Sequence, residues 1–424
     1  MENGMKLLVI ADDLTGGLDT GVQFALRGIT SRVMVNRRKW QSGKMDEGQV
    51  LILDTETRGM EGPKAYKTVK DIVKDACRDG VNCIYKKTDS GLRGNIGYEL
   101  QGVLDGLDGG LLHYVPAYPK KGRITRQGIH YVDGVPVAES SFGADLYEPV
   151  RYSYIPDIIH EQSRVTVERD CGQSTERTGE KKIRLYDASN EKELDRIAGR
   201  VAGWEAGGVT LMAGCAGFAE ALCRTIRDEP EEGLKLEKKD KFLAVIGSIH
   251  PMAVRQTNFA LRSGFERLEL SEEQLAEGYW ESKKGQELLD IWKEKCRRSR
   301  KILLDAGRLF GNHDIADYAK KTGVEKETVR RKIADCLGTV TCALMQDTER
   351  AALMVTGGDT LAGVMRSLKV EELLPRGELL QEVVYSEFVR DGRLAGLLSK
   401  SGSFGGESLL ADLAFLLLKE GEQA

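Results

Sequence analysis

Short apolar runs alternate with segments of helical periodicity through the first half of the chain. The runs Lys6–Ala11 and Val50–Asp54 are rich in Leu, Val and Ile, which is typical of strands buried on both faces. The segments Gly17–Arg27 and Ala65–Cys77 repeat apolar residues at helical spacing. Further strands are expected at Arg32–Val35, Cys83–Lys87, Leu111–Val115, Ser163–Glu168, Ile183–Asp187 and Val209–Ala213, with a helix at Asn95–Leu104. This alternation predicts a parallel sheet with helices on both faces.

The segment from Pro116 to Tyr152 interrupts this alternation. It is rich in proline, glycine and tyrosine, and it contains the tetrapeptide Val132-Asp133-Gly134-Val135, whose Asp-Gly pair favours a hairpin turn. Long irregular segments inside compact domains are often functional. We therefore expect an irregular excursion with a small hairpin, which could cover a substrate or be only a surface loop.

A strongly charged run separates the two halves of the chain. It reads DEPEEG from Asp228 and continues from Lys235 to Lys241, which predicts a linker between domains 1–235 and 236–424. Beyond it, strands are expected at Phe242–Ile246, Lys301–Leu304, Ala352–Thr356 and Glu382–Phe388, with helices from Thr360 and over Ser408–Leu418. The expected fold class is α/β with two domains, each built on a mostly parallel sheet flanked by helices.

Composition narrows the class of protein. The length of 424 residues suits two domains, and 41% apolar with 30% charged residues is ordinary for a globular protein. A net charge of −4 argues against nucleic-acid and membrane-surface partners, which call for a basic face. The segment 315–340 resembles a helix-turn-helix, but the acidic balance favours two packed helices without DNA binding.

Cysteine usage and the absence of long apolar runs bear on the compartment. The eight cysteines form no CxxC pair and no zinc-type spacing with histidine, so we expect reduced thiols. No secretory pattern opens the chain, and no apolar run approaches the roughly 18 residues of a membrane span. These features predict a cytoplasmic protein.

Two polar clusters follow predicted strands in the N-terminal half. Asp12 and Asp13 come directly after the first strand, where carboxylates can bind sugar hydroxyls or take a proton from one. A helix cap is the alternative interpretation of this pair. Arg58 follows the strand Val50–Asp54 and could hold a carboxylate through two hydrogen bonds, although a surface arginine is the commoner case.

A third cluster, KKTDSGLRGN, lies between the strand that ends at Lys87 and the next helix. Lys87 and Arg93 suit the negative charge of an acidic polyol, and Asp89 and Ser90 suit its hydroxyls. Basic residues at a helix start are disfavoured by the helix dipole, so a purely structural loop would not need them. The cluster therefore predicts a site for an anionic, sugar-like ligand.

The C-terminal half carries two glycine-rich turns. TGGDT at 356–360 follows an apolar strand and begins a helix, and KSGSFGG at 400–406 precedes another helix. Backbone amides at such helix starts bind phosphate, and Asp359 could hold Mg²⁺ or act as a base. Gly247 and Ser248 also follow a strand. Neither turn matches the Walker or Rossmann pattern, so we expect a different type of nucleotide site.

Five motifs in this order resemble the four-carbon acid sugar kinase family, which includes D-threonate, D-erythronate and 3-oxo-tetronate kinases. They are IADDLTGGLDT, KKTDSGLRGN, PAYPKKGRITRQGIHYVDGVPVAES, TGGDT and KSGSFGGESLL, and the resemblance covers nearly the whole chain. This sequence differs from the usual family motifs at two positions. Gly91 stands where threonine is usual, and Glu407 stands close to the usual acidic position but out of register.

The resemblance implies an N-terminal domain that binds an acid sugar, a C-terminal domain that binds ATP, and a reaction in the cleft between them. The residues that would contact the sugar are Asp12, Arg58, Lys87, Thr88, Asp89, Ser90 and Arg93. Those that would contact ATP are Ser248, Gly357, Gly358, Asp359, Thr360 and Gly402. Asp359, Asp12 and Asp13 are the candidates for catalysis, with Mg²⁺ as a cofactor.

Two other functions are consistent with the same residues. A nucleotide-dependent enzyme of another kind, such as a dehydrogenase, would bind a nicotinamide cofactor instead of ATP. A sugar-acid sensor would bind both ligands without turnover, although it would not need every acid. The sequence leaves the stereochemistry of the substrate, the phosphorylated hydroxyl and the oligomeric state open, and a homodimer is one option.

Overall fold

The chain divides into two compact units, Met1–Glu232 and Gly233–Ala424, which we call unit 1 and unit 2. The structure is a computed structural model. It describes residues 6–35, 49–107, 109–145, 147–172, 181–202, 209–227, 234, 236–248, 250–306, 318–319, 322–346, 351–380 and 382–419. Half of the predicted linker at 228–241, residues 228–233 and 235, lies outside these residues.

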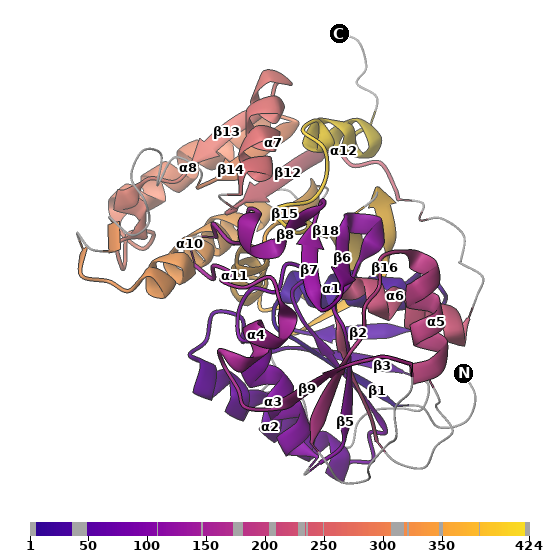
Figure 1. Cartoon of the computed structure of the whole chain (residues 1–424). Coiled ribbons are helices and arrows are strands. Elements are labelled where there is room, and N and C mark those ends of the chain that lie inside the picture. Colours follow the sequence, from indigo (N-terminus) through magenta and orange to yellow (C-terminus); the bar gives the residue numbers. More distant parts are fainter. Residues whose placement is uncertain are drawn as a thin grey trace. The chain divides into compact units, whose positions relative to one another are not determined.

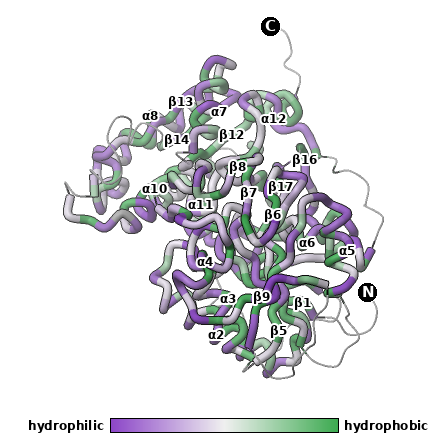
Figure 2. Tube along the Cα trace, in the orientation of Figure 1, coloured by the Kyte–Doolittle hydropathy of each residue, from purple (hydrophilic) through white to green (hydrophobic). Residues whose placement is uncertain are grey.

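Unit 1 is built on a parallel sheet with the strand order β2-β3-β1-β4-β11-β5-β10-β9. The strands are β1 Leu7–Ala11, β2 Ser31–Met34, β3 Val50–Asp54, β4 Cys83–Lys87, β5 Leu111–Val115, β9 Thr166–Arg169, β10 Lys182–Leu185 and β11 Thr210–Gly214. The central strands β1, β3 and β4 are buried along their whole length, which explains their apolar sequences. Figure 2 shows the hydropathy of each residue along the described part of the chain.

Helices cover both faces of this sheet (Figure 1). They are α1 Leu14–Ala25, α2 Gly62–Arg78, α3 Ile96–Gly106, α4 Ile155–His160, α5 Glu191–Val201 and α6 Ala216–Ile226. Helices α2 and α3 pack against each other, whereas α6 packs between α1 and α5. In α2 the buried residues recur every three or four positions, from Ala65 to Ala76, so that one face of the helix meets the core.

The excursion predicted at 116–152 contains a small antiparallel sheet of three strands, β6 Arg123–Arg126, β7 Ile129–Val132 and β8 Val135–Pro136. The predicted hairpin is confirmed, because Val132 pairs with Val135. Asp133 and Gly134 have φ angles of 51° and 84°, as both central residues of a tight hairpin turn require. The sequence did not predict β6, which pairs with β7 on the side away from β8.

Unit 2 has a sheet with the order β13-β14-β12-β15-β18-β17-β16. Its strands are β12 Lys241–Ile246, β13 Glu266–Glu269, β14 Lys301–Asp305, β15 Ala351–Thr356, β16 Glu372–Leu380, β17 Val383–Arg390 and β18 Arg393–Lys400. The pairs from β13 to β18 are parallel, and β16, β17 and β18 pair antiparallel. The expected class, α/β with a mostly parallel sheet in each unit, is confirmed, although the sequence predicted only β17 of the three antiparallel strands.

The described helices of unit 2 are α7 Pro251–Arg262, α8 Lys283–Arg298, α10 Lys326–Gln346, α11 Gly358–Ser367 and α12 Leu409–Leu417. Helix α10 covers the second half of the segment that resembles a helix-turn-helix, and it packs along α11. Much of the first half of that segment lies outside the described residues. None of the helices in the described part of the chain is long and apolar enough to cross a membrane.

Candidate active site

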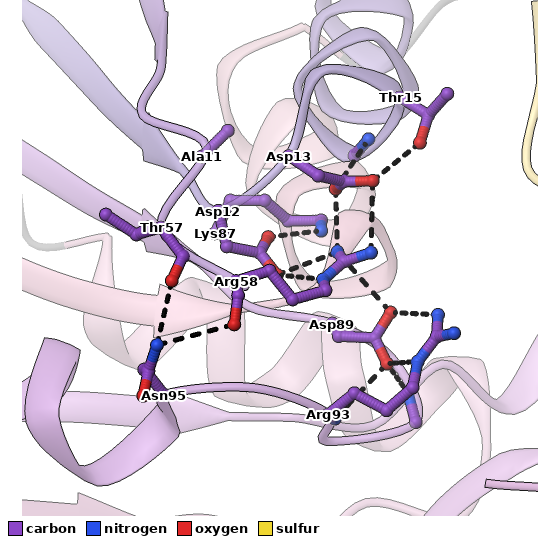
Figure 3. Close-up of polar contacts among 12 residues, drawn as sticks. Ala11, Asp12, Asp13, Thr15, Thr57, Arg58, Lys87, Asp89, Arg93 and Asn95 are labelled. Carbon is purple, nitrogen blue, oxygen red and sulfur yellow. Dashed lines mark hydrogen bonds and ion pairs between the residues drawn. The ribbon is translucent and has the colours of Figure 1, made fainter. Parts of the chain in front are cut away.

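Three neighbouring strands of unit 1 bring the predicted sugar-binding residues together. Strands β3, β1 and β4 lie side by side and run parallel, so their carboxyl ends meet at one edge of the sheet. Asp12 and Asp13 follow β1, Arg58 lies four residues after β3, and Lys87 is the last residue of β4. Figure 3 shows their side chains converging on the guanidinium group of Arg58.

Arg58 is the centre of this group. Its Nε donates to Asp12 Oδ2 at 2.7 Å, and its two terminal nitrogens donate to the two carboxylate oxygens of Asp13 at 2.7 and 3.1 Å. An oxygen of a third carboxylate, Asp89 Oδ1, lies 3.6 Å from Nη2. We call these residues together with Lys87 the Asp12 cluster. Because Arg58 is only 11% exposed, these ion pairs are formed largely away from water.

Asp12 is ionised in this setting. Burial disfavours its charged form, but Arg58 and Lys87 outweigh that effect and lower its pKa to about 2. Lys87 Nζ lies 3.4 Å from Asp12 Oδ1. Gly16, in the first turn of α1, makes this approach possible, because a Cβ atom on it would lie 2.3 Å from Lys87 Nζ. The helix-cap interpretation of Asp13 is confirmed, because its side chain accepts the Gly16 N–H at the start of α1.

Asp89 and Arg93 form a second, linked pair. Arg93 donates through Nε and Nη2 to the two oxygens of Asp89, at 2.9 and 3.0 Å, and its Nη1 reaches Asp145 at 3.1 Å. The backbone N–H groups of Gly91 and Arg93 also point to Asp89 Oδ2. Burial opposes ionisation of Asp89, but Arg93 and Arg58 together lower its pKa well below the ordinary value. Asp89 therefore remains a carboxylate and can accept hydrogen bonds from hydroxyls.

The remaining two residues of the predicted loop act partly through the backbone. Thr88 is fully buried, and its N–H donates to Gly214 O at 2.8 Å. The carbonyl of Ser90 lies 3.0 Å from His130 Nε2. Burial lowers the pKa of His130 to about 4, so the ring is neutral at physiological pH, Nε2–H donates to Ser90, and Nδ1 accepts from Thr125. His130, from the excursion at 116–152, thus fixes the position of the Ser90 carbonyl in the substrate loop predicted at 86–95.

Several supporting residues were not predicted from the sequence. Lys86 is completely buried, lies 3.3 Å from Glu99 Oε2 and donates to two backbone carbonyls. Asn95 donates to the carbonyls of Thr57 and Met60 at 2.8 and 2.7 Å, which fixes the turn that carries Arg58. A signal for Lys86 was present, because a lysine in a buried central strand requires a partner for its charge.

The predicted nucleotide-binding residues come together in unit 2. A Cβ atom on Gly402 would lie 2.2 Å from Ser248 Oγ, and one on Gly247 would lie 2.1 Å from Thr360 Oγ1. Gly357 precedes α11 with φ of 98°, a value that favours glycine, and its N–H donates to Lys400 O at 3.0 Å. The two glycine-rich turns therefore lie next to each other at the N-terminus of α11, where anions are favoured.

Gln256, fully buried on α7, shapes the second turn. Its Nε2 donates to the carbonyls of Phe404, Gly405 and Gly406 at 2.9 to 3.2 Å. Its Oε1 and Thr356 Oγ1 are buried without a hydrogen-bond partner among the described residues. Such groups are rare in folded proteins.

Lys400 is a further basic residue beside the glycine-rich turns, and no role was predicted for it from the sequence. It is the last residue of β18, is completely buried, and donates from Nζ to Ser401 O at 2.9 Å. Burial lowers its pKa to about 7, and Glu382 opposes this shift. A lysine with this pKa takes up a proton readily when an anion binds beside it. Its signal in the sequence was a lysine between an apolar strand and a glycine-rich turn.

Asp359 lies in the first turn of α11 and is half-exposed. It forms an ion pair with Arg330 of α10, from Nε to Oδ2 at 2.5 Å. The described residues contain no group of three or more His, Cys, Asp or Glu side chains arranged to hold a metal ion. Any divalent cation at Asp359 would therefore depend on further ligands such as phosphate oxygens and water.

The chain is a two-unit α/β protein with a cluster of charged side chains at strand ends in unit 1 and two glycine-rich turns at a helix N-terminus in unit 2. Residues 7–222 match the model of a sugar-binding N-terminal domain, and residues 243–410 match that of a nucleotide-binding C-terminal domain. The chain belongs to the family of four-carbon acid sugar kinases that these two domains define, as the sequence motifs predicted.

Curated relatives match over nearly the full length. A D-threonate kinase from Salmonella typhimurium is 29% identical over 97% of this chain and 98% of its own length. A D-erythronate kinase from Heliobacterium modesticaldum is 26% identical over 94% of both chains. A 3-oxo-tetronate kinase from Escherichia coli is 30% identical over a shorter stretch, 38% of this chain and 42% of its own.

Two solved structures share the fold. A Salmonella typhimurium protein presented as a tRNA synthase has a TM-score of 0.70 at 20% identity, and the match covers 96% of this chain and 98% of that one. A Haemophilus influenzae protein has a TM-score of 0.65 at 19% identity, with 96% and 99% coverage. At these identities the likeness shows the fold alone.

Proposed function

We propose that this protein is an ATP-dependent kinase that phosphorylates a hydroxyl of a four-carbon acid sugar such as threonate, erythronate or an oxo-tetronate. The observation that carries the proposal is the Asp12 cluster. It presents buried cations and ionised carboxylates together at adjacent strand ends, and it does so in a chain whose full-length relatives are named for tetronate phosphorylation.

The Asp12 cluster suits an acid sugar because it offers both kinds of hydrogen-bonding group. Arg58 and Lys87 can attract the carboxylate of the ligand, while Asp12 and Asp89 can accept from its hydroxyls. The ion pairs among these side chains fix their positions before a ligand binds. Pre-organisation of this kind lowers the cost of placing the reacting hydroxyl.

The second substrate, ATP, is proposed to bind unit 2 at the two glycine-rich turns. Ser248, Thr360 and the backbone of Gly357, Gly358 and Gly402 would contact its phosphates, with the N-terminus of α11 favouring negative charge. Mg²⁺ is usually held by phosphate oxygens, waters and one or two carboxylates. Asp359 fits the place of that carboxylate, and the cation would neutralise charge on the transferred group.

The candidates for the catalytic base are Asp359, Asp12 and Asp13. A pKa of about 2 makes Asp12 a weak base, so its best use is to orient a hydroxyl by accepting its hydrogen bond. Phosphoryl transfer with a loose transition state depends more on positioning and charge neutralisation than on a strong base. The cytoplasm, where ATP and small metabolites meet, is the location that we propose.

A panel of acid sugars tests this function. ADP release is measured with ATP, Mg²⁺ and tetronates, pentonates and their 2-oxo or 3-oxo forms, each with a matched blank that lacks the sugar. We expect release above the blank with at least one tetronate. Turnover on no acid sugar, with ATP binding intact, would exclude the sugar-acid assignment and favour a sensor. Reduction of a nicotinamide cofactor instead would favour a dehydrogenase.

A further inference from the structure

Gly91, inside the loop that holds Asp89, packs against an aromatic ring from another part of unit 1. A Cβ atom on Gly91 would lie 2.3 Å from both Cδ1 and Cε1 of Phe142, and 2.7 Å from its Cγ. Real side chains do not approach so closely, so the ring occupies the space that a side chain at position 91 would need. Phe142 is only 6% exposed, which shows that the contact is part of the core.

The loop that carries Phe142 is itself fixed. The carbonyl of Phe142 accepts from the N–H of Val150 at 3.1 Å, and its own N–H donates to Ser140 Oγ at 3.2 Å. Asp145 in the same loop accepts the N–H groups of Tyr147 and Glu148 at 2.9 and 3.0 Å. The ring and the carboxylate of Asp145 are therefore presented by one ordered turn.

The same ring contacts two guanidinium groups. Arg93 Cζ lies 5.1 Å from the centre of the Phe142 ring, and Arg123 Cζ lies 5.8 Å from it. Both distances are within the range of a cation–π interaction. Arg93 is thus held on three sides, by the ring and by the carboxylates of Asp89 and Asp145.

This arrangement links Phe142 to the Asp12 cluster. Arg93 uses two nitrogens on the two oxygens of Asp89, and Asp89 Oδ1 lies 3.6 Å from Arg58. If the ring is lost, Arg93 gains rotational freedom, and it orients the two oxygens of Asp89 less firmly. The aromatic ring therefore acts on the candidate sugar site through one arginine and one carboxylate.

We infer that Phe142 is a positioning residue for the acid-sugar site, and that Gly91 is glycine because any side chain there would displace the ring. The inference rests on the proposed function only for its effect on the sugar. The glycine at position 91 then has an explanation in packing, because the Phe142 ring occupies the space that a side chain there would need. The same ring fixes the position of the charged group of Arg93.

Phe142→Leu tests the inference, because it keeps an apolar side chain and removes the ring. We expect the KM for the acid sugar to rise about tenfold, with the KM for ATP within about twofold of the wild type. Gly91→Ala should act in the same direction by pushing the ring away. In the double variant Gly91→Ala/Phe142→Leu the alanine should add little, because the ring it would meet is absent.

Phe218→Leu is the matched control, since Phe218 is also a buried phenylalanine of unit 1 and its ring packs on Tyr85. It should lower the melting temperature and leave the KM for the sugar unchanged. If Phe142→Leu behaves in the same way, with lower stability but an unchanged KM, the ring is a core residue only and the inference is wrong.

Hydrogen exchange provides a readout that needs no turnover. The amides of Gly91 and Arg93 donate to Asp89 Oδ2, so the segment 88–95 should exchange faster in Phe142→Leu and in Gly91→Ala than in the wild type or in Phe218→Leu. Faster exchange in a protein that phosphorylates no acid sugar would keep the positioning role and reject the proposed function. Unchanged exchange in both variants would overturn the positioning role, whatever the activity.

Discussion

Units 1 and 2 build their candidate sites from different parts of the chain. In unit 1 the groups that face one another are charged side chains, and each is held by ion pairs with its neighbours. In unit 2 the corresponding place consists of glycines, hydroxyls and a helix N-terminus, with one buried lysine. A side-chain site can discriminate among ligands by charge and hydroxyl pattern, whereas a backbone site recognises the phosphate that all nucleotides share.

The difference also bears on stability. The Asp12 cluster concentrates ionised groups where water is scarce, so the loss of one partner leaves the others buried without compensation. The glycine-rich turns of unit 2 contain few charges, and changes there alter shape more than electrostatics. Variants in the two units should therefore differ in kind, with destabilisation in unit 1 and a selective loss of nucleotide affinity in unit 2.

The largest effect is expected for Arg58→Ala. Removing the guanidinium takes away the cation that Asp12 and Asp13 share and leaves Asp12 with Lys87 alone at 3.4 Å. This loss should cost about 3–5 kcal/mol of unfolding free energy. The KM for the acid sugar should rise on the order of a hundredfold in the protein that remains folded. Denaturant titration and steady-state kinetics measure the two effects.

Arg78→Ala is the control for this variant. Arg78 pairs with Asp75 on the exposed side of α2, where an ion pair contributes little. Its unfolding free energy should stay within about 0.5 kcal/mol of the wild type, with unchanged kinetics. If Arg58→Ala were as mild as this control, the Asp12 cluster would not be the charged centre that distinguishes unit 1.

A smaller effect is expected from the buried lysine of unit 2. The pKa of Lys400 is about 7 in the folded protein and 10.5 in a free side chain, so between these values the unfolded chain binds the extra proton. Its contribution to the unfolding free energy therefore rises with pH, by about 1.4 kcal/mol per pH unit inside this window. Between pH 7.5 and 9.5 the wild type should gain stability relative to Lys400→Met, as denaturant midpoints would show.

The matching comparison uses an exposed lysine. Lys283 on α8 is 92% exposed, so Lys283→Met should follow the wild type across the same pH range. A constant difference between the wild type and Lys400→Met from pH 7.5 to 9.5 would show that Lys400 is charged in both states. The candidate nucleotide site of unit 2 would then contain a permanent cation, which would reduce the contrast with unit 1.

The smallest effect is expected for Gly402→Ala. The added methyl group would meet Ser248 Oγ, which must rotate away and would no longer face the glycine-rich turns. The KM for ATP should rise about tenfold, equivalent to about 1.4 kcal/mol, with the KM for the acid sugar unchanged. Gly406→Ala is the control, because a Cβ atom there meets nothing within 4 Å. If the two variants had the same KM for ATP, Ser248 would not be part of the nucleotide site.

Much of this organisation was predictable from the sequence. Buried parallel strands have nearly uniform apolar sequences, so β1, β3 and β4 were recognised, and the residues after them could be assigned to one edge of the sheet. The strands β16 and β18 were not predicted. They mix charged and apolar residues and depend on pairing with β17, so neither of them has a clear signal of its own.

The limits were similar at the candidate site. The motif residues of unit 1 could be named from their strand ends, but the contact between Gly91 and Phe142 joins positions 51 residues apart, and no local pattern encodes it. The sequence presented Gly91 as a departure from the family. Only the packed structure shows which ring fills the vacated space, and that this ring bears on Arg93.

The proposed kinase function is tested most directly by following the phosphoryl group from ATP to the acid sugar. The intact protein is incubated with Mg²⁺, ATP labelled at the γ-phosphate, and D-threonate, D-erythronate or an oxo-tetronate, and the acid sugar is then isolated. If the protein is an acid sugar kinase, the label should appear on a hydroxyl of the acid sugar in an amount equal to the ADP formed. ATP binding without transfer of label to any of these acids would contradict this function.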